Sequence, residues 1–168
     1  LPELLNRYEV KRGDVYYIPS GTIHTIGKGI ELIEIQQASD ITYRVYDWDR
    51  VDSEGKGREL HTALAVDAID FEADAELLHK KYDVAKGGEA KVIECNYFTM
   101  VLHDVAGNKS FDHSSRDSFV VYIALNGSVR IIADGKEELL EEGEVILIPA
   151  EISEVIAEGN AKLMEVYI

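Results

Sequence analysis

A single histidine, His24, follows a pattern of turn residues that suits a metal-binding strand. The pattern is G-x5-P-x-G-x2-H, and its fixed positions are Gly13, Pro19, Gly21 and His24. Pro19 ends the strand-like segment before it because proline has no N–H for a ladder. Gly21 adopts backbone angles that other residues resist, so the chain can reverse there. Since neutral imidazole is the commonest protein ligand of divalent transition metals, we expect His24 to bind a metal. The alternative is a histidine satisfied within a barrel.

The pattern around His24 resembles the second metal motif of the cupins, and all its fixed positions are filled. Three stretches extend the likeness, namely GDVYYIPSGTIHTIGKGIELIEIQQ, SDITYRVYDWDR and RELH. They resemble the type I mannose-6-phosphate isomerases (phosphomannose isomerases) in their short bacterial form, closely over residues 1–70 and more loosely beyond. The resemblance implies a zinc-assisted interconversion of mannose 6-phosphate and fructose 6-phosphate, in which a proton moves between two carbons through an enediol.

Two residues match the functional positions that the resemblance implies. His24 would be a zinc ligand, and Arg44, in the segment TYR, would be an active-site arginine. A guanidinium aimed into a pocket can stabilise an enediolate or hold a substrate phosphate. The alternative for Arg44 is a salt bridge at the end of the barrel, with Asp47 or Asp49 as the partner. The general base is not identified.

The other zinc ligands implied by the resemblance are a Gln-x-His pair and a glutamate from upstream segments, and nothing in this chain matches them. Glu34 fits a rim position better than a ligand position. Because a zinc site needs about four ligands, we expect this chain to be the C-terminal portion of a longer protein and to be inactive by itself. We also expect an open barrel edge beside His24, which would promote self-association.

Composition limits the classes of partner. The chain has 168 residues, of which 46% are hydrophobic and 29% charged, and its 32 acidic and 17 basic residues give a net charge of −15. This charge argues against nucleic acids and anionic membranes as partners, so a sugar phosphate would need a locally basic pocket. A single cysteine, Cys95, excludes an internal disulfide. We expect a cytoplasmic protein, since no apolar run reaches membrane-spanning length and the N-terminus does not resemble a signal peptide.

The predicted fold is mainly β, with cupin-like antiparallel barrels of the jelly-roll type and few short helices. Residues 1–70 would be the C-terminal part of the catalytic barrel, incomplete in this chain. Residues 71–88, which have no strong periodicity, would be a linker. Residues 89–168 would form a second cupin-like barrel without a metal site.

Composition and alternation also predict individual elements. In the first part, strands are predicted at 15–18, 22–26, 30–37 and 41–46. A helix is predicted at 61–69, with Leu60, Leu64 and Ala68 on its buried side. In the second part, short strands are predicted at 89–95, 97–104, 117–125, 127–133, 136–140, 144–148, 153–157 and 161–167. The turns between them include Ala106-Gly107-Asn108, Asn126-Gly127 and Asp134-Gly135.

A short internal repeat links the two parts. The sequence GDVYYIP at Gly13–Pro19 recurs as GEVILIP at Gly143–Pro149, and each copy continues into a similar apolar run. An alignment with one deletion places Ser153 where His24 lies in the first copy. The second barrel would therefore have lost its metal ligand. The alternative is that this pattern is a common way to begin a strand after a turn.

Other readings remain open at the level of sequence. A non-catalytic cupin-like module for sugar binding or assembly is the main alternative to the isomerase. An iron dioxygenase would need two histidines and a carboxylate, a set that the sequence does not reveal. His103 and His113 flank a predicted turn and could form a metal pair, but they lack a recognisable partner. His61 is expected at a helix start and His79 in solvent.

Overall fold

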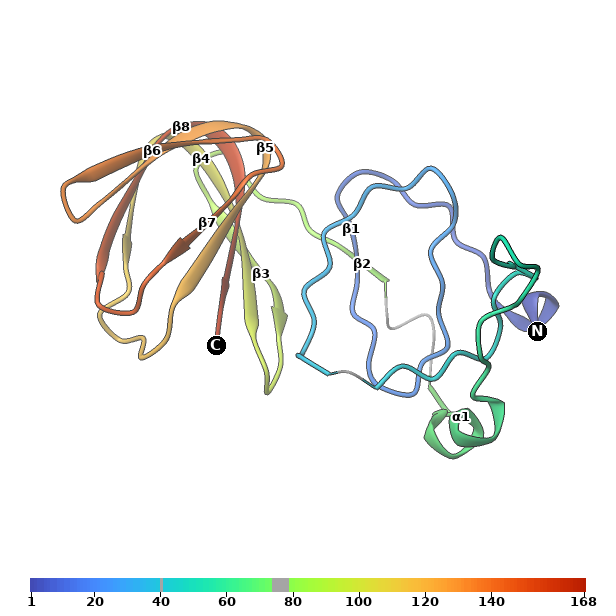
Figure 1. Ribbon diagram of the computed structural model, residues 1–168. Helices are drawn as coiled ribbons and strands as arrows, with labels where there is room; N and C mark the ends of the chain where they lie inside the picture. The colour runs from blue at the N-terminus through green and yellow to red at the C-terminus, as the bar shows by residue number, and fades with distance from the viewer. Residues whose placement is uncertain (40, 74–78) are drawn as a thin grey trace. The chain divides into compact units, whose positions relative to one another are not determined.

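The structure is a computed structural model that describes residues 1–39, 41–73 and 79–168 (Figure 1). It is mainly β, as predicted, with antiparallel pairing in its larger sheet. The chain divides into two compact units, Leu1–Lys80 and Lys81–Ile168. Within the described ranges, no helix is long and apolar enough to cross a membrane. The assignment of residues 1–70 to an incomplete catalytic barrel stays a prediction.

The first unit contains little regular structure. Its elements are η1 (Pro2–Leu4), β1 (Asp14–Tyr16), α1 (Thr62–Ala68) and β2 (His79–Lys81), which extends one residue past the unit. β1 and β2 form a two-stranded sheet. His79 stacks on Tyr16 with ring centroids 4.7 Å apart, and its Nε2 lies 3.4 Å from the Asp14 carboxylate. The prediction that His79 is solvated was therefore wrong, because it packs onto β1.

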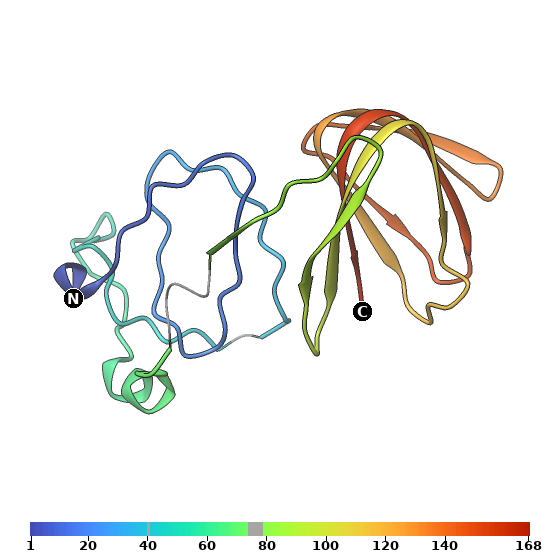
Figure 2. The same cartoon turned by 180° about the vertical axis from the view of Figure 1, so that it is seen from behind.

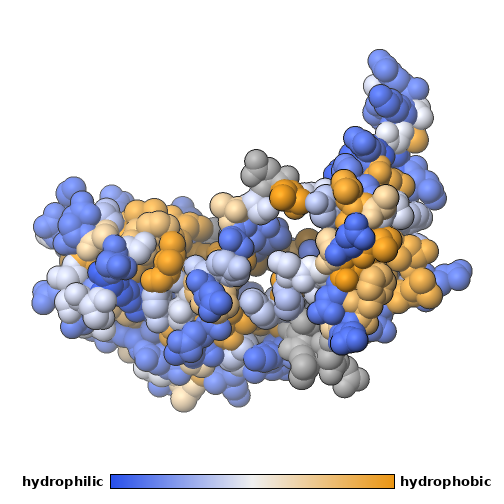
Figure 3. Space-filling model, turned by 90° about the horizontal axis from the view of Figure 1, so that it is seen from below, coloured by the Kyte–Doolittle hydropathy of each residue, from blue (hydrophilic) through white to orange (hydrophobic). Residues whose placement is uncertain are grey.

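The predicted strands at 22–26, 30–37 and 41–46 are not strands in the structure. β-Forming composition needs a neighbouring strand to complete its hydrogen bonds, and these segments make no such ladder among the described residues. Five of their apolar side chains are consequently 39–70% exposed, at Ile26, Ile30, Leu32, Ile33 and Ile41. Figure 2 shows these segments as irregular chain, and Figure 3 shows hydrophobic residues reaching the molecular surface.

The helix predicted at 61–69 is confirmed as α1, but its buried face differs by one residue. Ala65 is 3% exposed, whereas Leu64 is 55% exposed. Gly21 lies against the end of this helix, since the Asp70 N–H donates to its carbonyl at 3.0 Å. A Cβ at Gly21 would lie 2.7 Å from the Ala68 oxygen, and its φ is +85°. The glycine before His24 is thus required both by the turn and by the packing of α1.

The second unit is a curled antiparallel sheet (Figure 1). Its strands are β3 (Glu89–Glu94), β4 (Thr99–Asp112), β5 (Val120–Ala133), β6 (Lys136–Glu141), β7 (Val145–Ile148) and β8 (Glu154–Tyr167). The order is β3-β4-β8-β5-β6, and β7 pairs with β5. β8 pairs with β4 along its whole length and with β5 on its other side. The largest fully buried side chains, which include Tyr122, Ile131 and Leu163, lie inside the curl.

Two of the predicted turns lie inside long strands. β4, β5 and β8 each have 14 residues, so Gly107 and Gly127 bend strands instead of ending them. The register of β5 shifts between Ala124 and Asn126, and the Asn126 side chain accepts a hydrogen bond from the Lys162 N–H at 2.7 Å. This hydrogen bond to the Asn126 side chain replaces a backbone hydrogen bond of the β-ladder that the bulge removes. The Asp134-Gly135 hairpin between β5 and β6 is confirmed.

Gly127→Ala is expected to destabilise the second unit by about 2–4 kcal/mol. Gly127 has a φ of +66°, and a Cβ there would overlap the carbonyl oxygen of Asn160. Gly135 has a similar φ of +70° but open space around it. Gly135→Ala therefore serves as the control for backbone strain alone, at about 1 kcal/mol. Urea unfolding measures the loss of stability in both variants. Equal losses would show that the contact between residue 127 and β8 does not contribute to the destabilisation.

Candidate functional site

His24 follows the reverse turn after β1. The Thr22 N–H donates to the Pro19 carbonyl at 3.3 Å and closes this turn. The Nδ1 atom of His24 lies 2.9 Å from the Thr22 carbonyl oxygen. Because a carbonyl only accepts, Nδ1 carries the proton, and the lone pair is on Nε2. The ring is exposed, so Nε2 is open to a metal ion, with the orienting backbone hydrogen bond that metal-binding histidines commonly have.

Arg44 is held by its backbone to the start of α1. The His61 N–H donates to the Arg44 carbonyl at 2.8 Å, and the Arg44 N–H donates to His61 Nδ1 at 3.2 Å. The half-buried side chain donates from Nη1 to the Glu59 carbonyl at 3.4 Å. His61, expected at the helix start, is the N-cap residue of α1, but its ring binds the Arg44 backbone and does not cap the helix.

The salt-bridge alternative for Arg44 named Asp47 and Asp49 as partners. Asp47 is buried and binds Arg58, whose Nε donates to its Oδ2 at 2.7 Å. Hydrogen bonds from Arg58 hold the pKa of Asp47 below its usual value. Asp49 accepts a hydrogen bond from the Tyr46 hydroxyl at 3.4 Å. Arg44 pairs with neither acid among the described residues, so its guanidinium retains donors for another group.

The structure shows no direct contact between His24 and Arg44 in the part of the chain that it describes. That part also holds no group of three or more histidine, cysteine or acidic side chains arranged for a metal ion. His24 fits a metal by its tautomer and exposure, and it accounts for one ligand. The two roles therefore stay predictions.

Hydrogen bonds at both ends of the repeated segment support the internal repeat. At the start of the segment, Lys11 N–H donates to Asp14 Oδ2, and Glu141 N–H donates to Glu144 Oε2, both at 2.8 Å. At its end, Thr22 N–H donates to the Pro19 carbonyl at 3.3 Å, and Ile152 N–H donates to the Pro149 carbonyl at 3.1 Å. The offset is 130 residues throughout, so the turns align without a deletion. Glu154, the exposed first residue of β8, then occupies the position of His24. The alignment that placed Ser153 there was wrong.

A buried polar cluster in the second unit surrounds Glu165, which is 2% exposed. The His103 Nε2–H donates to Glu165 Oε2 at 3.0 Å, and Arg116 Nη1 donates to Oε1 at 2.6 Å. His113 Nε2 lies 3.3 Å from the same Oε1 and 2.9 Å from the Tyr122 hydroxyl. Four residues from distant parts of the sequence thus converge on one carboxylate.

The cluster keeps Glu165 ionised. Burial by itself would raise the pKa of Glu165, but hydrogen bonds from His103 and Arg116 and the Arg116 charge outweigh it and lower the pKa to about 2. Burial lowers the pKa of His113, and the nearby Arg116 charge adds to this effect. Burial raises the pKa of Tyr122, so its hydroxyl remains a neutral donor. The centre of the cluster is therefore an ion pair between Glu165 and Arg116.

The cluster is the main feature that sequence reasoning missed. His103 and His113 do not flank a turn, because β4 runs unbroken from one almost to the other. The carboxylate that pairs them spatially is Glu165, and an acid inside the apolar run LMEVYI was the available signal. A metal ion would have to compete with Arg116, whose guanidinium already contacts Glu165.

Low pH is expected to lower the free energy of unfolding of the second unit, because Glu165 becomes protonated. Its folded pKa of about 2 lies below the usual 4.5. The pairing therefore stabilises the fold at pH values above about 4.5, and the contribution, about 3 kcal/mol, is lost as the pH falls through about 2. Urea unfolding between pH 6 and 2 should show a steep fall that Glu165→Gln flattens. The exposed acid Glu154, changed to Gln, is the control, and an equal slope in all three proteins would contradict the assignment.

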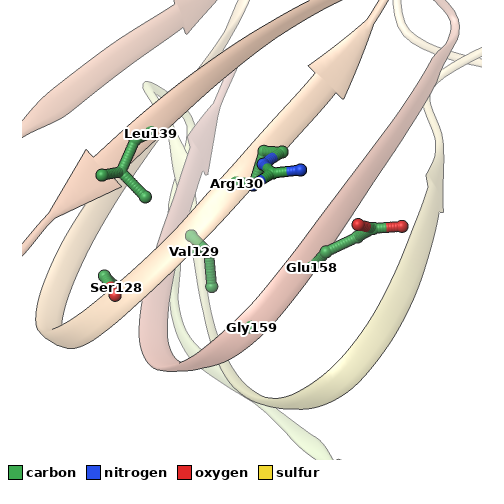
Figure 4. A pocket seen from close by; sticks show the side chains of 6 residues that line it. All are labelled: Ser128, Val129, Arg130, Leu139, Glu158 and Gly159. Atoms are coloured by element: carbon green, nitrogen blue, oxygen red, sulfur yellow. The ribbon is translucent and has the colours of Figure 1, made fainter.

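Two hollows lie on the second unit. One is a groove of about 320 Å³, and its polar lining residues, Ser128, Arg130 and Glu158, are exposed or half-buried. Figure 4 shows the side chains that line it. The other hollow, of about 430 Å³, lies beside the Glu165 cluster, with His103, His113 and Arg116 among its lining residues. In the second unit, the buried polar side chains His103, His113 and Glu165 thus gather at the second hollow.

Curated relatives align with nearly the whole chain, and a family model matches its C-terminal part. Residues 88–168 match the family described as mannose-6-phosphate isomerase, cupin domain. The chain is 37% identical over 163 residues to mannose-6-phosphate isomerase ManA of Bacillus subtilis, covering 95% of this chain and 50% of that protein. It is 30% identical over 161 residues to the mannose-6-phosphate isomerase of Streptococcus mutans, covering 96% and 50%. The chain therefore spans about half the length of these curated relatives.

Solved structures show the same similarity. The mannose 6-phosphate isomerase from Bacillus subtilis superposes with a TM-score of 0.65 at 30% sequence identity, covering 77% of this chain and 41% of that chain. A mutant of phosphomannose isomerase from Salmonella typhimurium superposes with a TM-score of 0.54 at 26% identity, covering 67% and 28%. The predicted cupin-like fold class is confirmed by these matches together with the antiparallel sheet.

Proposed function

We propose that this chain, whose residues 88–168 match the family described as mannose-6-phosphate isomerase, cupin domain, serves the interconversion of mannose 6-phosphate and fructose 6-phosphate. The observation that carries the proposal is the extent of the similarity. It covers 95% of the chain and so includes His24 and Arg44 as well as the cupin domain. The reaction needs a base at the substrate carbon and an electrophile at its oxygens.

His24 is the residue proposed to hold the metal. A zinc ion, when bound, would orient the sugar and stabilise oxyanion charge. The Nδ1–H of His24 bonded to the Thr22 carbonyl supports this role, since it leaves the Nε2 lone pair exposed. The remaining ligands are not found among the described residues. We therefore expect this chain to bind zinc weakly unless other ligands complete the site.

Arg44 is proposed to neutralise charge on the enediolate or on the substrate phosphate. Its backbone bonds to His61 support this role because they fix where the side chain begins. One Nη1 bond to a backbone carbonyl leaves the guanidinium with further donors. A local cation of this kind is what an anionic substrate needs in a chain with a net charge of −15.

The setting proposed for this function is the cytoplasm, where sugar phosphates are available, and nucleic acids and membranes are not proposed as partners. The exposed apolar side chains of the first unit support the expectation that the isolated chain self-associates. Size-exclusion chromatography with light scattering at several concentrations measures this directly. A monomer at every concentration would contradict it.

The activity is tested with two proteins in a coupled assay that follows fructose 6-phosphate. The 168-residue chain with added zinc is expected to give background turnover and less than one zinc per chain. A fusion that supplies the remaining half of the Bacillus subtilis relative is expected to turn over mannose 6-phosphate. Robust turnover by the chain alone would show that it carries a complete site. An inactive but folded fusion would favour a non-catalytic module.

A further inference from the structure

The hollow beside Glu165 has the size and lining of a small-molecule site. Its volume of about 430 Å³ lies within the range of ligand pockets in proteins. It lies along β3, β4 and β8, with side chains from both halves of β4. Phe111 and Tyr167 supply aromatic surface, and charged side chains supply donors and acceptors. All of its lining residues belong to the second unit, whereas His24 and Arg44 belong to the first.

The principal donor in this hollow is held rigidly. The Arg116 side chain is 18% exposed, and its Nη1 donates to the buried Glu165 carboxylate at 2.6 Å. Its guanidinium carbon lies 3.6 Å from the centroid of the Tyr167 ring, on which it stacks. His103 holds the opposite oxygen of Glu165. Because the Glu165 contact and the Tyr167 ring already fix the Arg116 guanidinium, its other N–H groups can bind a ligand without a further loss of side-chain conformational entropy.

A buried histidine completes the polar wall. His113 Nε2 lies within hydrogen-bonding distance of the Tyr122 hydroxyl, which donates in turn to Glu165 at 3.4 Å. His113 is 3% exposed, and its Nδ1 has no hydrogen-bond partner in the described residues. His103 Nδ1, in contrast, lies 3.2 Å from Glu89 Oε2. Buried polar atoms without partners are uncommon in folded proteins, and a ligand hydroxyl in the hollow would give His113 Nδ1 a partner.

The charges around the hollow select the class of ligand. Three cations line it, Lys91, Lys109 and Arg116, and so do three acids, Glu89, Asp112 and Glu165. The acids cancel the cations, in a chain with a net charge of −15. A phosphate or carboxylate ligand gains little there. An uncharged polyhydroxy molecule offers donors to the acids and acceptors to the cations.

We propose that the hollow beside Glu165 binds a neutral polyhydroxy compound of monosaccharide size, such as an unphosphorylated hexose or a hexitol. Arg116 and Lys109 would donate to its hydroxyl oxygens. Glu89, which is 60% exposed and pairs with Lys109 at 3.1 Å, would accept from its hydroxyl hydrogens. The Phe111 ring would cover an apolar face of the ligand. The second unit would then respond to the unphosphorylated sugar independently of the reaction proposed for the first.

The test is amide NMR of the ¹⁵N-labelled 168-residue chain, titrated with D-mannose, D-mannitol, mannose 6-phosphate and inorganic phosphate. Mannose or mannitol is expected to shift resonances of residues such as Ser110, Asp112 and Tyr167, with saturation by about 50 mM. Mannose 6-phosphate is expected to bind no more tightly than mannose, and phosphate to leave these resonances unchanged. Because the readout lies in the second unit, it is independent of isomerase activity.

Two variants give the matched comparison. Glu89→Gln keeps nearly the same shape, but it replaces one accepting carboxylate oxygen with a donating amide NH2 and removes the charge, so it is expected to raise the Kd for mannose about ten-fold. Arg130→Gln removes a charge at the groove of Figure 4, and the Kd for mannose is expected to stay unchanged in this variant. Absence of shifts up to about 100 mM sugar, tighter binding of phosphate, or an unchanged Kd in folded Glu89→Gln would each overturn the proposal.

Discussion

His24→Ala in the fused enzyme is expected to lower kcat/KM for mannose 6-phosphate by at least about 100-fold, together with zinc content. The loss of a group that merely orients a metal ligand already costs 10–100-fold, so the loss of a ligand costs no less. His24 offers an exposed Nε2 lone pair because its Nδ1–H is bonded to the Thr22 carbonyl. Elemental analysis of purified protein and the coupled assay measure the two effects.

The control for His24 is the neighbouring exposed residue Thr25, changed to Ala. It should retain both zinc and activity. Circular dichroism should be the same in all three proteins, since His24 is exposed and its side chain bonds only locally. If the His24 variant keeps stoichiometric zinc and full turnover, then His24 is not a ligand. If zinc stays and activity falls, the residue acts on the substrate and not on the metal.

Arg116→Met should destabilise the second unit by about 3–5 kcal/mol. Removing one partner of a buried ion pair leaves the other charge uncompensated, at a cost of this size. Glu165 is 2% exposed, and Arg116 is its cationic partner at 2.6 Å. Arg130→Met, which breaks the exposed pair with Glu137, should cost less than about 1 kcal/mol. Urea unfolding at pH 7 compares the two.

A double mutant separates lost charge pairing from lost packing at Arg116. Arg116→Met combined with Glu165→Met removes both charges, and much of the stability should return because no buried charge remains unpaired. Stacking on Tyr167 is lost in both the single and the double variant, so it cancels in the comparison. Equal losses in the single and the double variant would show that Arg116 stabilises by packing and not by pairing with Glu165.

Local features were predictable where neighbouring residues decide the structure. The Asp134-Gly135 hairpin and α1 were found from sequence because turn chemistry and helical spacing act over a few residues. The repeated turn was recognisable for the same reason, and its hydrogen bonds recur in both copies. The His24 prediction also rested on local spacing, and the backbone bond to Thr22 gives its ring the tautomer that a ligand needs.

Tertiary structure decided what depends on distant partners. Composition predicted strands at 22–26 and 30–37, but a strand needs a ladder with a neighbour, and local propensity cannot supply one. Gly127 resembled a turn, yet the pairing of β5 with β8 carries the strand through it. The Glu165 cluster joins β4, β5, β8 and the loop that holds Arg116, so no spacing pattern along the chain could reveal it. Its members are close only because the curled sheet brings these segments together around one buried carboxylate.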